Sequence, residues 1–338
     1  MKIKVISVKP ILTEEQIKDK EGHKFPESHY KQIIKRDADV YGINENGEKQ
    51  LLFKFRKNVI PYDVCVKAYM ALEKHAKHKN NNRGAAAGVI NSTKSLPSHV
   101  GKITKKDKFR IFYKTKSGKV SRDNISNMSH SNIAGYYDRP DRNLYNTKYK
   151  NTNKTKKMSN GVVKDKKGAP LCRTTKFTAQ EVGKWKETIP LVKCADKLFA
   201  ELVPDRHTIQ LKRARLTPKF QIDNTAYSTI TINYDWRTSA HRDSGDLEEG
   251  FGNLLVLEKA KCVDFEKNIN YMKPGSKSTG YSGAYLGFPR WGIAVDVRQG
   301  DYLAMDVHQF HANTELHGSG RLSVVCYLRK KMINCKIN

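Results

Sequence analysis

The sequence predicts an α+β fold, with a strand-rich C-terminal half and a basic N-terminal half. Three observations support this prediction. Short strand-like runs separated by Gly, Asp, Asn and Pro fill residues 220–330. Two longer runs, 61–79 and 182–203, have apolar residues at helical spacing. Residues 80–170 are rich in Asn and Lys and short of aliphatic side chains.

The N-terminal part is expected to contribute two strands and a helix. Residues 1–12 alternate apolar and polar side chains, and LLFKF at 51–55 is typical of a second strand. The helix over 61–79 has a proline in its first turn and Lys and His near its end, where the helix dipole favours cations. The helix over 182–203 is expected to be interrupted near Pro190, because proline lacks the N–H that a helix interior needs.

Strand-like runs then follow one another to the end of the chain. Such regular spacing favours a sandwich, a barrel or a jelly roll. The runs are FQIDNTAYSTITINYDW (220–236), GNLLVLEKAKCVDF (252–265), GAYLGFP (283–289), GIAVDVRQGDYLAMDVHQFHAN (292–313) and GRLSVVCYLRK (320–330). We therefore divide the chain into an N-terminal β/α segment (1–57), a leading helix with a basic insertion (58–170) and a strand-rich core (171–338).

The charge is large and unevenly placed. Lys and Arg number 63 against 34 Asp and Glu, a formal net charge of +29. Residues 51–170 hold 28 basic and 7 acidic side chains, whereas residues 171–338 hold 25 and 18. A field of this sign favours a phosphate-rich partner, although a merely well-solvated basic surface is the alternative. We expect loops and a mobile basic insertion over 80–170, because such composition cannot bury enough apolar surface for a core of its own.

Aromatic residues lie among these cations. They are suited either to stacking on bases or to anchoring loops on the domain beneath. The tyrosines concerned are Tyr113, Tyr136, Tyr137, Tyr145 and Tyr149.

The cysteines and the hydropathy indicate a soluble intracellular protein, in the nucleus or cytoplasm, or in a host cell if the chain is viral. The six cysteines form no CxxC pair and no regular framework, so we expect reduced thiols. They are Cys65, Cys172, Cys194, Cys262, Cys326 and Cys335. No run approaches about 18 apolar residues, so no membrane partner is expected, and we expect a monomer.

A metal-ligating pattern stands in the strand-rich half. His241 and Asp243 form an HxD motif, and on a strand the i, i+2 spacing puts both side chains on one face. A second imidazole from a distant strand would complete the two-His, one-carboxylate set that leaves three positions open on Fe(II). DVHQFHAN supplies His308 and His311, which differ by three and so lie on opposite faces of a strand. Spacing alone leaves both open.

Arg321 follows His311 by ten residues, within the strand-like run GRLSVVCY. A guanidinium that points into a metal site can bind the distal carboxylate of a dicarboxylate co-substrate through two hydrogen bonds. A lone HxD is weak evidence for a metal. The ordered set of HxD, a histidine about 70 residues later and an arginine ten residues beyond is far more demanding.

Two segments resemble a known family. TITINYDWRTSAHRDSGDLEEGFGNLLVL and HANTELHGSGRLSVVCYLRK are similar to the first ligand strand and the closing strands of the TET/JBP group of Fe(II)/2-oxoglutarate nucleic-acid base dioxygenases. The resemblance covers residues 220–332. It implies a double-stranded β-helix, or jelly-roll, core with flanking helices. It selects His311 over His308 as the third ligand, and it implies that Arg321 anchors 2-oxoglutarate with Ser323 as a hydroxyl donor.

The resemblance also suggests roles for neighbouring residues. Asp246 falls where the family places a polar residue that contacts the target base, although it could merely cap a turn. Asn233 and Thr238 lie just upstream of the ligands, where they reach either the co-substrate or only strand-end hydrogen-bond partners.

The resemblance implies Fe(II), 2-oxoglutarate and O2 as cofactor and co-substrates, with ascorbate as an accessory reductant. The implied reaction hydroxylates the 5-methyl group of thymine or 5-methylcytosine in double-stranded DNA, whose target base is flipped out, with RNA as an alternative substrate. RGAAAG (83–88), AGYYDR (134–139) and residues 148–167 are candidates to grip the DNA backbone, with Arg83 and Arg139 as individual guesses.

Two other functions compete with this one. The same fold could hydroxylate a protein side chain or a small molecule, against which the basic segment argues. The chain could also be a non-catalytic nucleic-acid-binding protein, against which the intact ligand set argues. The chain lacks the CxxC zinc module of the large animal members, so DNA contact would fall to the basic segments.

Overall fold

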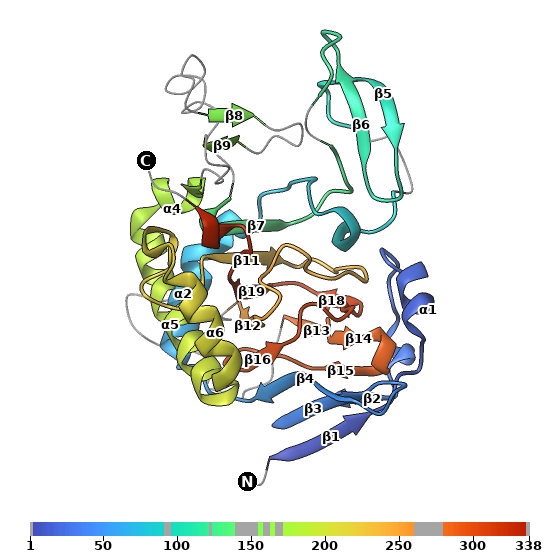
Figure 1. Cartoon of the computed structure of the whole chain (residues 1–338), viewed down its shortest axis with the longest axis vertical. Helices are drawn as coiled ribbons and strands as arrows, with labels where there is room; N and C mark the ends of the chain where they lie inside the picture. The colour runs from blue at the N-terminus through green and yellow to red at the C-terminus, as the bar shows by residue number, and fades with distance from the viewer. Residues whose placement is uncertain are drawn as a thin grey trace.

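The computed structural model describes residues 3–90, 96–121, 124–138, 172–259 and 280–335, together with the backbone of two short strands at 155–157 and 163–165. The sequence-based suggestions about Arg139, Tyr145, Tyr149, Cys262 and most of 148–167 lie outside these residues. The described part is a mixed α+β structure in which two β-sheets face each other and helices cover one of them (Figure 1). The predicted α+β class is confirmed.

A nine-stranded sheet forms the centre of the molecule. Its strands in spatial order are β1 (Lys4–Val8), β3 (Ala38–Ile43), β4 (Lys49–Arg56), β16 (Tyr302–Met305), β12 (Gly252–Glu258), β19 (Arg321–Tyr327), β11 (Thr229–Tyr234), β7 (Ser131–Tyr137) and β10 (Arg173–Thr174). Within this sheet β1 and β3 are parallel, and the other neighbouring strands are antiparallel. All three predicted segments contribute strands, since β1, β7 and β19 lie in this one sheet.

A smaller sheet lies opposite. It contains β17 (Ala312–Asn313), β14 (Leu286–Phe288), β15 (Ile293–Val295) and β2 (Gln32–Ile34), and a separate pair joins β13 (Tyr281–Gly283) to β18 (Leu316–Gly318). The two sheets share an apolar core in which the rings of Phe53 on β4 and Phe288 on β14 stack with centroids 5.2 Å apart. The strand-rich half therefore folds as facing sheets, as the regular spacing of its runs predicted.

Helices cover the outer face of the large sheet (Figure 1). They are α2 (Tyr62–Ala76), α4 (Lys176–Gln180), α5 (Val182–Leu202) and α6 (Pro204–Ala214), while α1 (Glu14–Asp19) lies apart from them. Strand alternation explains which face they cover. On β19, Leu322 and Val324 point into the core beneath the helices, whereas Arg321 and Ser323 belong to the opposite face.

The expected interruption at Pro190 is wrong, because α5 runs through this residue without a break. Proline removes only one helical hydrogen bond there, and the next turns bury Leu191, Ala195 and Phe199 against α2 and the sheet. Packing of this apolar face outweighs the lost bond. The helix predicted over 61–79 is confirmed as α2.

The expectation of loops over 80–170 is wrong for residues 100–106, 111–115 and 131–137. They form β5 (Val100–Lys106), β6 (Ile111–Thr115) and β7, and the further strands β8 (Thr155–Lys157) and β9 (Val163–Asp165) pair with each other. Short alternating stretches supply the apolar surface, with Ile111 and Ala134 almost fully buried. The high average content of Lys and Asn over residues 80–170 led to the prediction of loops, because it outweighed these short apolar stretches.

Short turns complete the structure. The 3-10 turns are η1 (Glu27–His29), η2 (Gly84–Ala87), η4 (Pro218–Phe220), η5 (Pro289–Trp291) and η6 (Met332–Asn334).

The expectation of reduced cysteines is wrong for one pair. Cys172 and Cys335 form a disulfide that joins the segment before β10 to the C-terminal turn, across 163 residues of sequence. Cys65, Cys194 and Cys326 are free thiols. Separately, none of the helices among the described residues is long and apolar enough to span a bilayer.

The stacked pair that joins the two sheets gives a test of the fold. Phe288→Ala should lower the free energy of unfolding by about 3–5 kcal/mol, because it empties a fully buried site between the sheets. Val5→Ala, at a side chain that is 61% exposed, should change it by less than about 0.5 kcal/mol. Denaturant titration of both variants measures the difference, and equal effects would show that Phe288 does not hold the sheets together.

Candidate metal and anion site

The structure brings His241, Asp243 and His311 together. Their ligand atoms all lie within 4.8 Å of one another. The two histidines form an antiparallel bridge in which the N–H of His241 donates to the carbonyl of His311 (3.1 Å) and the N–H of His311 donates back (3.0 Å). This single bridge joins two segments that are 70 residues apart in the sequence. It brings the two imidazole ring centroids to 4.3 Å from each other. The HxD motif does not continue as a regular strand, because turns follow the bridge.

Both imidazoles are oriented by their own backbone. Nδ1 of His241 lies 2.7 Å from the carbonyl oxygen of Ser239, and Nδ1 of His311 lies 3.0 Å from that of Gln309. A carbonyl oxygen only accepts, so each Nδ1 carries a proton, which leaves Nε2 as the ring atom that can ligate a metal. These Nε2 atoms lie 3.6 and 3.7 Å from the two carboxylate oxygens of Asp243. The three side chains thus turn two imidazole nitrogens and one carboxylate toward one point.

Burial keeps the His241 ring neutral. Desolvation, followed by the proximity of His311, lowers the pKa of His241 to about 4. A neutral imidazole is the form that binds a metal ion. Asp243 is placed by a hydrogen bond from its own N–H to the carbonyl of Val307 (3.0 Å).

His308 lies outside this cluster. Its Nδ1 is 3.4 Å from the carboxylate of Asp306, and this hydrogen bond raises the pKa of His308. Residues 306–309 form a turn rather than a strand, so the alternation argument could not distinguish His308 from His311. The structure places His311 in the cluster.

Arg321 is a buried cation on the inner face of β19. Its side chain is only 2% exposed, and in the described part of the chain its Nε has no hydrogen-bond partner and its guanidinium faces no carboxylate within ion-pair distance. Glu258 stands opposite in the strand register, but its carboxylate is occupied by Arg298 (3.0 Å) and by the hydroxyl of Tyr281 (3.1 Å). An unpaired buried charge costs several kcal/mol, so this position calls for an anionic ligand.

Two more polar groups beside Arg321 are incompletely satisfied. Asn233 on β11 pairs in register with Ser323, and its amide donates to the Ser323 hydroxyl oxygen (3.3 Å). The Ser323 hydroxyl therefore keeps its own proton for another acceptor. The amide oxygen of Asn233 is buried and has no partner among the described residues. The side chains of Arg321 and Ser323 together can donate to a carboxylate, and the Asn233 amide holds the Ser323 hydroxyl in place.

Thr238 does not join this group. Its hydroxyl donates to the side-chain oxygen of Asn313 (2.8 Å) and accepts from the Asn313 N–H (3.2 Å). It ties the segment before His241 to β17, which is the strand-end role that the sequence left open.

The loop at 83–88 supports the cluster from outside the strand-rich half. The Ser239 N–H donates to the carbonyl of Ala86 (2.9 Å), and the Ser239 carbonyl accepts from His241. Arg83, in the same loop, donates from Nε to the carbonyl of Ser131 (3.2 Å) and lies close enough to Asp243 for that carboxylate to favour its charge. Arg83 therefore lies beside the cluster rather than on the outer surface.

A second polar cluster adjoins the first. Asp246 is buried, and its N–H donates to the carbonyl of Asp243 (3.1 Å). Its backbone pairs with that of Arg329 in an isolated antiparallel β-bridge. Desolvation and the charge of Asp243 hold the pKa of Asp246 well above its usual range. Asp138, just after β7, binds the Arg329 guanidinium through two contacts of 3.1 and 3.3 Å. Neither Asp138 nor Arg329 was predicted as a site residue, although the candidate segment AGYYDR (134–139) contains Asp138.

Tyrosines line this second cluster. The Arg329 guanidinium lies 5.1 Å from the ring centre of Tyr137, and the Tyr327 hydroxyl lies 3.0 Å from that of Thr231. Alternation along β19 puts Tyr327 on the same inner face as Arg321 and Ser323.

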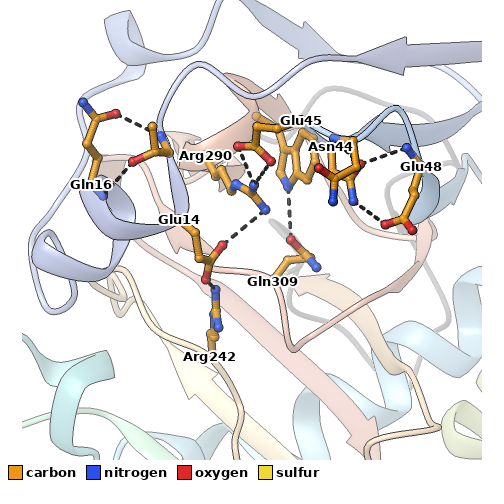
Figure 2. Close-up of polar contacts among 11 residues, drawn as sticks. Glu14, Gln16, Asn44, Glu45, Glu48, Arg242, Arg290 and Gln309 are labelled. Atoms are coloured by element: carbon orange, nitrogen blue, oxygen red, sulfur yellow. Dashed lines mark hydrogen bonds and ion pairs between the residues drawn. The ribbon is translucent and has the colours of Figure 1, made fainter.

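Salt bridges and a hydrogen bond from α1 and η5 also hold the segments that carry His241 and His311 (Figure 2). Glu14 on α1 contacts Arg242, which lies between the two HxD residues, and its carboxylate also lies 3.2 Å from Arg290. Arg290 binds Glu45 through contacts of 2.9 and 2.8 Å. Trp291 next to it donates its indole N–H to Gln309, the residue whose carbonyl orients His311 (Figure 2).

Comparison with known proteins agrees with this geometry. A family model described as the oxygenase domain of the 2OGFeDO superfamily, Tet_JBP, matches residues 159–330. The bifunctional helicase and thymine dioxygenase JBP2 of Leishmania major is 33% identical over 168 residues, which cover 48% of this chain and 13% of that protein. The thymine dioxygenase JBP1 of Trypanosoma brucei brucei is 29% identical over 174 residues, covering 49% of this chain and 18% of that protein.

The chain thus spans less than a fifth of the length of these relatives. A solved structure, NgTET1 in complex with 5mC DNA, superposes with a TM-score of 0.47 and 11% sequence identity, over 96% of this chain and 94% of that one.

The cluster predicts a sharp difference between two nearby histidines. His311→Ala should abolish Fe(II) or Co(II) binding, a loss beyond the roughly 10–100-fold that follows from altering a residue that only orients a ligand. His308→Ala should leave the metal affinity within that smaller range, because His308 contacts Asp306 instead. Anaerobic metal titration followed by absorbance measures both, and retention of tight binding by His311→Ala would refute the assignment.

A matched glycine pair tests the support from the 83–88 loop. Gly88 has φ +87°, and a Cβ there would lie 2.9 Å from the Ser239 hydroxyl oxygen, whereas Gly118 has φ +80° and no described neighbour within 4 Å. Both alanine variants should lose about 1–3 kcal/mol of stability, because each puts a Cβ on a backbone with positive φ. Only Gly88→Ala should also weaken metal binding, because it displaces the residue that orients His241. Equal metal affinities in the two variants would show that Ser239 does not set the ligand geometry.

Proposed function

The chain belongs to the Tet_JBP family of 2OGFeDO-superfamily oxygenases, and on this basis we propose that it is an Fe(II)- and 2-oxoglutarate-dependent dioxygenase that hydroxylates the 5-methyl group of a pyrimidine in DNA. The observation that carries the proposal is the pairing of two sites. A donor set of two histidines and one aspartate lies beside an inner face whose buried arginine has no anion among the described residues. The facing sheets around it are taken to be the double-stranded β-helix core.

The donor set fits Fe(II). Two imidazoles and one carboxylate are the facial triad typical of non-haem iron oxygenases, and they leave coordination positions open. His241, Asp243 and His311 would hold the ion, and the ion with 2-oxoglutarate and O2 would supply the oxidising chemistry when bound. A softer or fully closed metal site would need thiolates or a fourth protein ligand, and the described residues add neither to the cluster.

The anion site fits 2-oxoglutarate. One carboxylate of this dicarboxylate would be received by the Arg321 fork and the Ser323 hydroxyl, with Asn233 adjacent. The buried charge of Arg321 would then be neutralised, which removes the cost of leaving it unpaired. The protein's part is to orient the co-substrate and to exclude water around it.

The second polar cluster is suited to receive a base. In this proposal the buried Asp246 would offer a carboxyl group to the edge of a base, and Tyr327 would offer an aromatic ring on the same face as the anion site, while Asp138 holds the neighbouring Arg329 guanidinium. Hydrogen-bond donors and acceptors of this kind read base edges. Since His311 is 4% and Arg321 2% exposed, a base within a duplex would have to leave the stack to reach them. The similarity to thymine dioxygenases favours thymine over 5-methylcytosine as the substrate.

The proposal is tested by incubating the full chain with Fe(II), 2-oxoglutarate and O2 on DNA that carries thymine or 5-methylcytosine, with and without ascorbate. Mass spectrometry of the nucleosides should detect a 5-hydroxymethyl pyrimidine together with stoichiometric succinate. Arg321→Lys keeps the charge but loses the planar fork, so it should raise the KM for 2-oxoglutarate by about tenfold or more while metal titration stays unchanged. Succinate formation that depends on a peptide or metabolite, with no oxidised base, would overturn the DNA assignment.

A further inference from the structure

We propose that the hairpin of β5 and β6, with its flanks, is a rigid arm that binds the phosphate backbone of double-stranded DNA beside the catalytic site. The arm comprises residues 96–121, which lie within the basic insertion expected to contact nucleic acid but outside the three segments, 83–88, 134–139 and 148–167, suggested to grip the DNA backbone. Figure 1 shows it standing out from the body of the molecule above the η2 turn. The inference rests on the proposed function for the identity of the partner.

The charge of the arm is almost entirely of one sign. Eight basic side chains stand against the single acid Asp107, whose carboxylate accepts the Phe109 N–H (2.8 Å) within the connecting turn. Six exposed lysines have no carboxylate of a described residue within ion-pair distance. They are Lys102, Lys105, Lys106, Lys114, Lys116 and Lys119. On the body of the chain, by contrast, Lys54, Lys57 and Lys77 each face an acidic partner.

An isolated two-stranded hairpin is marginal in water, and like charges on paired strands destabilise it further. This hairpin is nevertheless held firmly at its base. Ile111, next to the connecting turn, exchanges backbone hydrogen bonds with Ile125, which lies outside the arm. Within the arm, the hydroxyl of the buried Tyr113 lies 3.0 Å from Nε2 of His99. Phe109 packs so closely over Gly22 that a Cβ there would lie 2.3 Å from its ring. The fold thus keeps a self-repelling cationic element in one position, which is of use only if an anion neutralises it.

The arm is also fixed relative to the catalytic residues. The Ile90 N–H donates to the Lys108 carbonyl (3.0 Å), so the turn of the hairpin is bound to the end of the 83–88 loop. The same loop holds Ser239 through its Ala86 carbonyl, and Ser239 in turn orients His241. A polyanion on the arm is therefore held at a set position relative to the metal cluster.

The shape of the arm favours a linear partner. The seven residues of β5 span about 23 Å at roughly 3.3 Å per residue. That length corresponds to about six or seven base pairs of duplex at roughly 3.4 Å each. The lysines are spread along the two strands and the turn that follows β6 rather than gathered at one point, as contact with successive phosphates requires. Lys105 additionally lies 6.0 Å from the ring centre of Phe112, so an aromatic face adjoins the charges.

The test compares two charge-matched triple variants of the full chain. Lys102→Gln, Lys105→Gln and Lys114→Gln together neutralise the arm, while Lys186→Gln, Lys212→Gln and Lys219→Gln neutralise exposed lysines on the helical layer. Fluorescence anisotropy without oxygen or 2-oxoglutarate measures duplex affinity as a function of salt. The arm variant should bind about tenfold or more weakly, and its slope of log K against log salt should fall by about 3. The helical-layer variant should match the wild type.

Two further measurements separate the possible failures. The corresponding triple Lys→Arg variant keeps the charge and should retain wild-type binding, which excludes misfolding of the arm as the cause. On a short single-stranded oligonucleotide that fills the site but cannot reach the arm, the Gln variant should keep the wild-type kcat and KM, and on a long duplex only its KM should rise.

Equal losses in both Gln variants, no loss in the arm variant, or tighter binding of duplex RNA than of duplex DNA would each overturn the proposal. Salt-dependent DNA binding through the arm without any oxidised base would support the arm while refuting the proposed reaction. Oxidation of DNA together with binding that does not depend on the arm would support the proposed reaction and refute the arm.

Discussion

The reciprocal pair of backbone hydrogen bonds between His241 and His311 is the constraint on which the rest of the site depends. Directly opposed residues of an antiparallel pair have closely spaced Cα atoms, so joining these two residues brings their imidazoles to one place without any contribution from the side chains. Each ring is then turned by a carbonyl two residues earlier in its own segment. The donor set is thus a property of the backbone, and the side chains need only be histidine and aspartate.

Hydrogen bonds to the backbone also fix the position of the anion site. The Asp235 carboxylate accepts the N–H groups of Gly320 and Arg321, and the Asp235 N–H donates to the Arg321 carbonyl. This clamp joins the end of β11 to the start of β19 just before the chain turns toward His241. Other arginines enclosed by the sheets have carboxylate partners, as Arg56 has Asp39 and Arg290 has Glu45. Arg321 differs in having its backbone fixed while its guanidinium has no such partner among the described residues, which is the arrangement needed to receive an external anion.

Much of this could be predicted from the sequence, because the chemistry is local in each motif. HxD, the later histidine and the arginine ten residues beyond it were recognisable as ligand types at meaningful spacing, and the strand runs of the C-terminal half followed from alternation and turn residues. Alternation could not separate His308 from His311, since the segment that carries them is a turn. The pairing of Asp138 with Arg329 spans 191 residues, and only the register of the sheet brings the two together.

The N-terminal half shows a different limit of sequence analysis. Composition averaged over many residues predicted loops, yet a few well-spaced apolar side chains, such as Ile111 and Tyr113, suffice to seat strands on an existing body. Such residues need not form a core of their own, because β7 and α2 complete a core supplied mainly by the C-terminal half. The disulfide of Cys172 with Cys335 was likewise beyond reach, since spacing along the chain carries no information about pairing across 163 residues.

Under the proposed function, a buried site and a large polyanionic substrate impose opposite requirements. The metal and anion residues must be shielded, because water would weaken the contact between Arg321 and its carboxylate. A duplex, however, can only be held from outside, through phosphates that carry no information about the base. In the proposed arrangement, the arm tied to the 83–88 loop, whose lysines face no described carboxylate, would hold the phosphates, and residues on β19 and in the turn after His241 would contact the base. Affinity would then reside in salt-sensitive contacts outside the site, and selection of the base in buried hydrogen bonds that salt hardly affects.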